Sequence, residues 1–164
     1  MQDDAPYTYA GANGKSVNNY DRRYRGFTTL REAITDSINI VTVKTLAQAG
    51  VSLGWQYVQE YGFTTVDSRD MNEALALGGI TQGVSNLELT AAYAAIANQG
   101  TYIRPKFYTK ILDHDGNVLI DNTTPESHTV IKDTTAWLLT SAMEDVMTSG
   151  TGTSAYFGSS MLRQ

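Results

Sequence analysis

Two short patterns in the sequence carry side chains with a recognised catalytic or ligating chemistry. The first, Gly50-Val51-Ser52-Leu53-Gly54, matches G-x-S-x-G, in which a strained turn between a strand and a helix raises a serine nucleophile above a sheet. The residues before Ser52 follow a helical period, so we interpret the match as a junction between two helices. A hydrolase would also need His114 or His128 as its base, and His114 falls in a predicted turn.

The second pattern, Asp113-His114-Asp115-Gly116-Asn117, resembles the beginning of a calcium-binding loop. Its glycine falls at the fourth position, and Thr124 stands where a bidentate glutamate should close the loop, so the ligand frame fails. Apolar runs flank the Asp-Gly pair, which is typical of a β-hairpin, here within residues 102–121. With no cysteine and two histidines in the chain, we predict no metal site and no cofactor.

A third pattern, Ser37-Ile38-Asn39, places a hydroxyl and a carboxamide two residues apart. Taken alone, S-x-N carries almost no information, because both side chains compete for backbone hydrogen bonds and commonly interrupt a helix. Its meaning therefore depends on the elements that surround it.

Helical patterns lie on both sides of this break. Thr29 and Glu32 have the spacing of a capping box, so a helix should start near Thr29. The helical pattern resumes over residues 40–49 and should stop at Gly50. A further helix, capped by Ser52, is expected to follow.

The rest of the chain divides into an irregular beginning and two more helices. Residues 1–26 lack apolar periodicity and are predicted to form an irregular segment. Ser85 and Glu88 form a second capping box ahead of an alanine-rich helix, and a last helix should cover residues 133–149. We expect these two helices to form the core. The apolar face of the last helix consists of Trp137, Leu138, Ala142, Val146 and Met147.

Length and charge restrict the function classes. The 164 residues suit one compact domain or a large part of a bigger one. Acidic residues outnumber basic ones 17 to 12, so no basic excess favours nucleic-acid binding. The absence of cysteine excludes disulfides and thiol chemistry. No apolar stretch approaches the ~20 residues of a membrane span, and the acidic N-terminus does not resemble a signal peptide. We therefore expect a cytosolic protein or a soluble part of a longer one.

Short elements follow one another in a defined order along the chain. They are Tyr24-Arg25-Gly26, Thr28-Thr29-Leu30-Arg31-Glu32-Ala33, Ser37-Ile38-Asn39, Val43-Lys44, Gly62-Phe63, Ala76-Leu77-Gly78-Gly79, Gly83-Val84-Ser85, Leu87-Glu88-Leu89, Ala92-Tyr93-Ala94, Asn98-Gln99-Gly100, Lys110-Ile111, Gly116 and Gly150-Thr151-Gly152 with Ala155. In this order they resemble the transpeptidase domain of class A penicillin-binding proteins, the bifunctional cell-wall synthases, over most of residues 18–155. The order is specific, although no single element is.

The resemblance implies acyl transfer in cell-wall synthesis. In that family the serine of an S-x-x-K motif, activated by the lysine, attacks the D-Ala–D-Ala bond of a peptidoglycan stem peptide. The acyl group then passes to an amine of a neighbouring stem, and β-lactams acylate the same serine. Ser37 would relay a proton toward the leaving group, and Asn39 would hydrogen-bond the substrate backbone. The parent protein would be membrane-anchored, with its enzymatic part on the extracytoplasmic face, and would support cell shape.

The family has three catalytic motifs, S-x-x-K, S-x-N and K-T-G, and only S-x-N occurs in this chain. The residues three positions before the lysines are Ala12, Val41, Ile103, Phe107 and Thr129, so no S-x-x-K exists. Lys44-Thr45-Leu46 does not match K-T-G. Because the family has S-x-x-K upstream of this segment and K-T-G soon after it, we expect the chain to be the interval between them. Such a chain should be inactive alone and should not bind β-lactams covalently.

The resemblance also predicts the fold. We expect an α+β fold over residues 27–164: the mostly helical part of a penicillin-binding-protein or serine β-lactamase-like transpeptidase domain, with one β-hairpin. Apolar surface that normally packs on the missing central strands would be exposed and could cause self-association. The alternative function is a non-catalytic binding module derived from the same fold, which contacts protein or glycan without chemistry.

Overall fold

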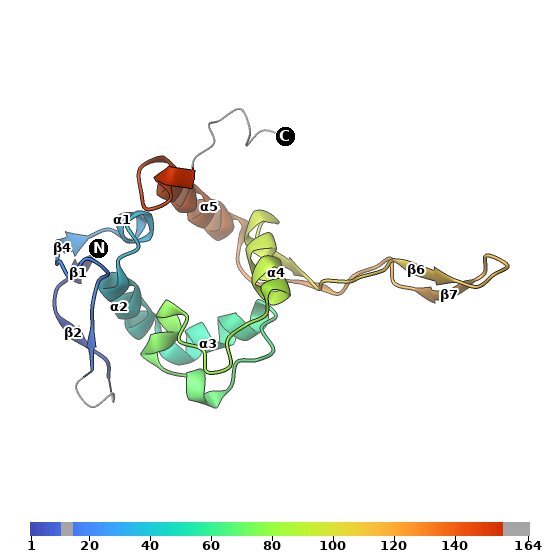
Figure 1. Cartoon of the computed structure of the whole chain (residues 1–164), viewed down its shortest axis with the longest axis horizontal. Helices are drawn as coiled ribbons and strands as arrows, with labels where there is room; N and C mark the ends of the chain where they lie inside the picture. Colours follow the sequence, from blue (N-terminus) through green and yellow to red (C-terminus); the bar gives the residue numbers. More distant parts are fainter. Residues whose placement is uncertain (11–14, 156–164) are drawn as a thin grey trace.

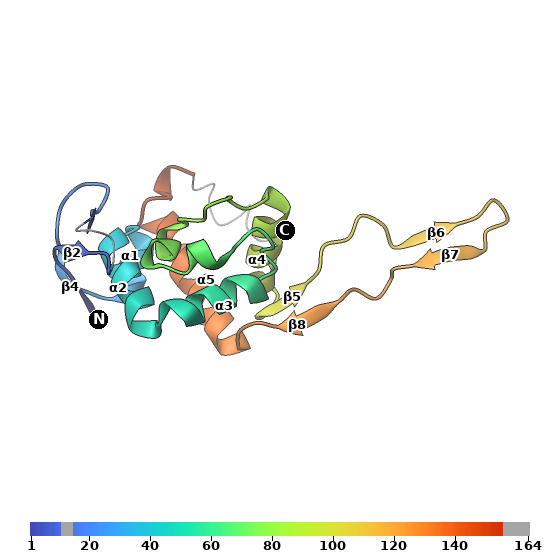
Figure 2. The same cartoon turned by 90° about the horizontal axis from the view of Figure 1, so that it is seen from below.

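A computed structural model gives the structure of residues 1–10 and 15–155. The α-helices in this part of the chain are α1 (Leu30–Thr35), α2 (Asn39–Ala49), α3 (Val51–Glu60), α4 (Asn86–Ala97) and α5 (Asp133–Thr148). Short 3₁₀ turns are η1 (Ser68–Asp70), η2 (Glu73–Leu77) and η3 (Thr153–Ala155). The helices gather in one body, and a long two-stranded ribbon projects from it (Figures 1 and 2). The predicted α+β class, mostly helical with small sheets, is confirmed.

The strands pair in two-stranded antiparallel sheets. β1 (Gln2–Asp4) pairs with β4 (Gly26–Thr28), and β2 (Tyr7–Thr8) pairs with β3 (Ser16–Val17). The expectation of an irregular segment over residues 1–26 is therefore wrong in part. These strands are two or three residues long, so each is too short to give the alternating apolar pattern from which strands are predicted.

The helix starts follow from the capping boxes. The Thr29 side chain accepts from the Glu32 N–H, and the Glu32 carboxylate accepts from the Thr29 N–H at 2.8 Å. Ser85 and Glu88 make the same reciprocal pair ahead of α4. Each helix begins at the residue after its cap, as predicted, because the pair satisfies backbone donors that the first turn leaves free.

The junction between α2 and α3 differs from the prediction. α3 begins at Val51, with Gly50 as the N-cap residue, and Ser52 lies inside the helix. Gly50 has φ of 101° and also ends α2, so one glycine joins the two helices without a loop. A helix precedes Ser52 where a nucleophile elbow requires a strand. The structure therefore supports the junction between two helices and not the nucleophile elbow of a hydrolase.

The projecting ribbon contains the predicted hairpin. β6 (Lys110–Leu112) pairs with β7 (Val118–Asp121). The Asp113 carboxylate accepts from the backbone N–H groups of Asp115 and Asn117 at 2.9 and 2.8 Å, which closes the turn. At the base of the ribbon, β5 (Thr101–Ile103) pairs with β8 (Ser127–Thr129), a strand that the sequence did not predict (Figure 2).

The most deeply buried apolar side chains lie at the beginning of α2. Ile38 is 1% exposed, and Ile40, Val41 and Val43 are 0% exposed. Burying one such side chain contributes about 1.5–3 kcal/mol. Ile38 and Val41 pack with Ala33, whereas Ile40 and Val43 pack with Val17, so both clusters hold the beginning of α2 against its neighbours.

The predicted core was correct for α4 and, on the face of α5, correct for Ala142 but wrong for Trp137 and Leu138. Ala91 and Ala95 of α4 are buried against Tyr102 and Val130. In α5, however, Trp137 and Leu138 are exposed, whereas Ala136 and Ala142 are buried. α5 packs against α1 and α4. Small residues let helix backbones approach closely, so the alanine side of α5 faces its neighbours.

In the described part of the chain, no helix combines the length and the apolarity needed to cross a bilayer.

Candidate functional site

Ser37-Ile38-Asn39 forms the connection between α1 and α2. The Ser37 N–H donates to the Ile34 carbonyl at 3.2 Å, and the Ile38 N–H donates to the Ala33 carbonyl at 2.9 Å. Ile38 is buried in one cluster with Ala33 and Val41. These bonds, with their apolar contact, form a Schellman motif at the end of α1. The buried Ile38 thus keeps Ser37 exposed on the outside of the turn.

Ser37 has a strained backbone. Its φ is 56°, in the left-handed region that Schellman motifs usually assign to glycine. For a residue with a Cβ this conformation costs about 1–2 kcal/mol. Such strain is concentrated at functional sites, so a serine here favours a role for its hydroxyl over a purely structural role.

Asn39 is the first residue of α2 and is half-buried. Its Nδ2 donates to the backbone carbonyl of Asn18 at 2.9 Å. The structure brings both predicted residues, Ser37 and Asn39, to one pocket of about 590 Å³. The remaining residues that line it are Asn19, Tyr20, Asp21, Arg25, Asp36, Ile38 and Thr151.

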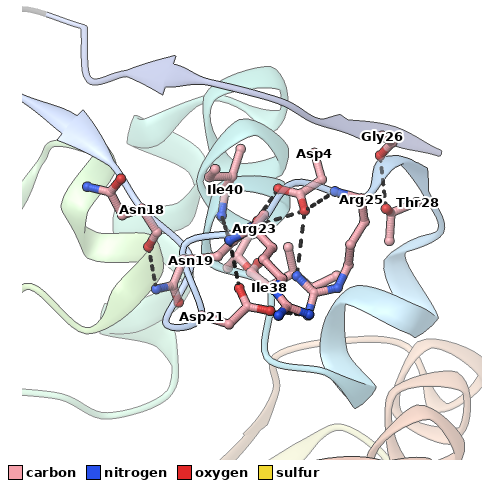
Figure 3. Close-up of polar contacts among 12 residues, drawn as sticks. Asp4, Asn18, Asn19, Asp21, Arg23, Arg25, Gly26, Thr28, Ile38 and Ile40 are labelled. Carbon is pink, nitrogen blue, oxygen red and sulfur yellow. Dashed lines mark hydrogen bonds and ion pairs between the residues drawn. The ribbon is translucent and has the colours of Figure 1, made fainter.

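The loop before β4 contributes one wall of this pocket. Arg25 pairs with Asp21 at 3.0 Å and approaches the buried Asp4 carboxylate at 3.8 Å (Figure 3). The pKa of Asp21 is lowered, chiefly because the Arg23 N–H donates to its carboxylate and also because Arg25 bonds it. The positive charge of Arg25 is therefore partly neutralised, and Arg25 has a fixed place in the pocket wall.

The turn after α5 contributes another wall. The Thr151 N–H donates to the carbonyl of Thr35, the last residue of α1, at 3.2 Å. Thr151 lies at the pocket as a result, although the sequence singled out its segment only as part of a resemblance. Arg25 was likewise named only as part of that resemblance, and sequence analysis missed Asn19, Tyr20 and Asp21. These residues reach the pocket through non-local contacts, for which a local pattern gives no signal.

No lysine is among the residues that line this pocket within residues 1–10 and 15–155. Lys44, the lysine nearest in sequence, donates from Nζ to the carbonyls of Asp3 and Ala5 at 2.7 and 3.4 Å. It ties β1 to α2 and has a structural role. The pocket thus offers hydroxyl and amide groups for hydrogen bonding and proton transfer, but no lysine that could activate a nucleophile.

The other patterns with possible chemistry remain apart from this pocket. Ser52 lies in α3, His114 in the turn between β6 and β7, and His128 in β8. The His128 ring bonds the Glu60 carbonyl at 2.8 Å. Among the described residues, no group of three histidine or acidic side chains could hold a metal ion.

Comparison with known proteins relates most of the chain to one family. The family model described as the penicillin binding protein transpeptidase domain matches residues 2–161. The chain is 40% identical over 139 residues to penicillin-binding protein 1F of Bacillus subtilis (strain 168), a match that covers 85% of the chain. It is 34% identical over 152 residues to penicillin-binding protein 1A/1B of the same organism, which covers 92% of the chain. The chain spans about a fifth of the length of these curated relatives, 19% and 16% respectively.

Solved structures share the fold. The crystal structure of penicillin-binding protein 1A from Haemophilus influenzae superposes with a TM-score of 0.77 at 24% identity, over 92% of this chain and 27% of that one. The crystal structure of the D,D-transpeptidase domain of a peptidoglycan glycosyltransferase from Eggerthella lenta gives a TM-score of 0.71 at 19% identity, over 97% of this chain and 46% of that one. At these identities the structures establish the fold alone.

Proposed function

The chain belongs to the penicillin-binding protein transpeptidase domain family, and on that premise we propose that it supplies the S-x-N motif of a peptidoglycan D,D-transpeptidase. The observation that carries the proposal is the shared pocket of Ser37 and Asn39, with Ser37 held in a strained conformation. Class A penicillin-binding proteins are among the relatives that support it.

The proposed reaction is an acyl transfer between two stem peptides. A serine outside this chain attacks the carbonyl carbon between the two D-alanines, and the C–N bond breaks to leave an ester on the serine. The attacking serine gives its proton to the lysine of S-x-x-K, and the Ser37 hydroxyl relays a proton from that lysine to the departing D-Ala nitrogen while Asn39 hydrogen-bonds the peptide backbone. The amine of a second stem then attacks the ester and forms the new amide, and its proton returns to the attacking serine as the ester C–O bond breaks.

The 164-residue chain alone is proposed to be inactive, because its sequence contains neither S-x-x-K nor K-T-G. The test is incubation with a labelled penicillin followed by intact-protein mass measurement. We expect no adduct; a stoichiometric adduct on any serine of this chain would overturn the proposal.

The role of Ser37 is tested in a domain that joins this chain to an S-x-x-K segment and a K-T-G strand. Ser37→Ala should slow acylation by penicillin about a hundredfold, the lower range for loss of a proton-transfer group. Ser52→Ala is the matched control, since Ser52 is an exposed helical serine outside the pocket. An unchanged acylation rate for Ser37→Ala would exclude the proton relay.

We further propose that stem peptides and β-lactams are ligands of the assembled domain, that its parent is membrane-anchored, and that it acts on the extracytoplasmic face of the bacterial membrane. These proposals extend from the family and the named relatives. A penicillin-labelled band in the membrane fraction of cells expressing the parent supports them; a band confined to the cytosol contradicts them.

A non-catalytic binding module is the second candidate, and the exposed Trp137 and Leu138 on α5 favour it. Large exposed apolar groups commonly mark interaction sites. Under this alternative, a partner that co-purifies with the chain should remain bound when Ser37 and Asn39 are both replaced by alanine. Loss of the partner in that variant would favour the catalytic proposal.

A further inference from the structure

Asp4, the last residue of β1, carries a buried carboxylate. It is 0% exposed and accepts from Asn19 Nδ2 at 2.8 and 3.0 Å and from the Arg25 N–H at 2.9 Å (Figure 3). A charge removed from water destabilises a fold unless such donors compensate it. Asp4 therefore depends on the loop before β4, and that loop depends on Asp4.

Asn19 extends this network to α2. Its side chain is 4% exposed, and Nδ2 also donates to the Arg23 carbonyl at 2.8 Å. Its Oδ1 accepts from the Ile40 N–H at 3.2 Å. The N-cap residue of α2, Ile38, provides no side-chain hydrogen bond. Asn19 thus caps α2 from 21 residues away in the sequence, satisfying a donor that the first turn of a helix leaves free.

Two consecutive loop residues bond two consecutive helix residues. The Asn18 carbonyl accepts from the Asn39 side chain, and the Asn19 side chain accepts from the Ile40 N–H. The same loop provides Asn19, Asp21 and Arg25 to the pocket. A shift of this loop would therefore move the side-chain amide of Asn39 and one wall of the pocket together.

We propose that Asp4 and Asn19 are positioning residues of the S-x-N site, a proposal that rests on the function proposed above. Asp4 does not line the pocket. It orients Asn19, and Asn19 fixes the first turn of α2, from which Asn39 projects its amide toward Asn18. The pair acts on the acyl transfer through Asn39 and the pocket wall, without contact to the substrate.

The variant Asp4→Asn tests this role, because it keeps the size of the side chain and removes the charge. Asp70→Asn is the matched control. Asp70 is also 0% exposed and accepts from the backbone N–H groups of Thr81 and Asp67 at 2.7 and 3.0 Å, but it does not line the pocket. Both variants remove a buried charge that holds a loop. Only Asp4→Asn disturbs the hydrogen bonds that run from Asp4 through Asn19 to the first turn of α2.

The first measurement is amide hydrogen exchange by NMR on the 164-residue chain. Asp4→Asn should speed exchange of the Ile40 N–H about tenfold or more and leave α4 and α5 protected. Asp70→Asn should leave the exchange rate of the Ile40 N–H within about twofold of the rate in the unsubstituted chain. Equal effects of both variants on Ile40, or no effect of Asp4→Asn, would overturn the proposal. If Asp4→Asn and the milder Asn19→Ser both abolish protection in α4 and α5, the pair serves global folding and the proposal is rejected.

The second measurement is acylation by labelled penicillin in the joined domain. Asp4→Asn should slow acylation about tenfold, whereas Asp70→Asn should not, even where both variants lower the melting temperature. If Ser37→Ala slows acylation but Asp4→Asn does not, only the positioning role is rejected and the proposed function stands. Unchanged acylation in Ser37→Ala rejects the proposed function itself, so the two failures are distinguishable.

Discussion

Gly150 packs against the backbone carbonyl of Thr35, so closely that a β-carbon at position 150 would lie 2.2 Å from that oxygen. The next residue donates its N–H to the same oxygen at 3.2 Å. This contact joins the end of α5 to the end of α1 and brings Thr151 to the pocket with Ser37. The absence of a side chain at Gly150 therefore allows the close contact that brings Thr151 to the pocket.

Gly150→Ala should destabilise the chain by about 1–3 kcal/mol, the usual effect of forcing an extra carbon into a packed contact. Chemical denaturation measures it. The neighbouring Ser149→Ala is the control, because Ser149 is exposed and donates only to the Asp145 carbonyl; its effect should stay within about 0.5 kcal/mol. A neutral Gly150→Ala would mean that the turn can move away from α1.

Ser37→Gly should raise the stability of the chain by about 1 kcal/mol, because glycine adopts φ of 56° without the Cβ penalty. Ser37→Ala keeps the Cβ and should bring no such gain. In the joined domain both variants should be acylated about a hundredfold more slowly, since both lack the hydroxyl. A stabilised variant without activity would indicate that the serine is kept for chemistry at the expense of stability.

Glu88 should make the fold sensitive to acid. The Thr64 hydroxyl donates to it at 2.7 Å, the Ser85 and Thr64 N–H groups also donate, and these bonds lower the pKa of Glu88 to about 2. Because the folded pKa is lowered, the stabilisation is fully present above the unfolded value of 4.5 and disappears as the pH falls toward 2.

Glu88→Gln should reduce stability at pH 7 by about 1 kcal/mol, the usual contribution of a helix cap, and should flatten the decline between pH 4.5 and 2. Denaturant unfolding across this range measures both effects. Glu144→Gln, at an exposed position of α5, should keep the slope of the parent chain. An equally steep decline in Glu88→Gln would assign the acid sensitivity to other carboxylates.

Local signals account for what the sequence predicted, and non-local contacts account for what it missed. The starts of α1 and α4 follow from capping boxes within four residues. β8 has no such signal, because its pairing with β5 joins Tyr102 to His128 across the hairpin. The pocket wall around Asn19 likewise depends on the buried Asp4, which no sequence pattern connects to it.

The apolar pattern of α5 illustrates a different limit. It identified a helix with an apolar stripe, but a period of 3.6 residues does not say which neighbour covers that stripe. Trp137 and Leu138 are 68% and 58% exposed because α5 turns its alanines toward the body. They line a hollow of about 750 Å³ between α4 and α5.

This exposed face predicts self-association of the 164-residue chain. Trp137→Ser should weaken the association about tenfold or more, because buried tryptophans dominate many interfaces. Light scattering and sedimentation over a concentration series measure it. Phe107→Ser is the control, because Phe107 is 88% exposed on the ribbon and not on α5. If only Phe107→Ser dissociates the assembly, the contact lies on the ribbon. If the unsubstituted 164-residue chain is a monodisperse monomer that melts cooperatively, self-association through either surface is excluded.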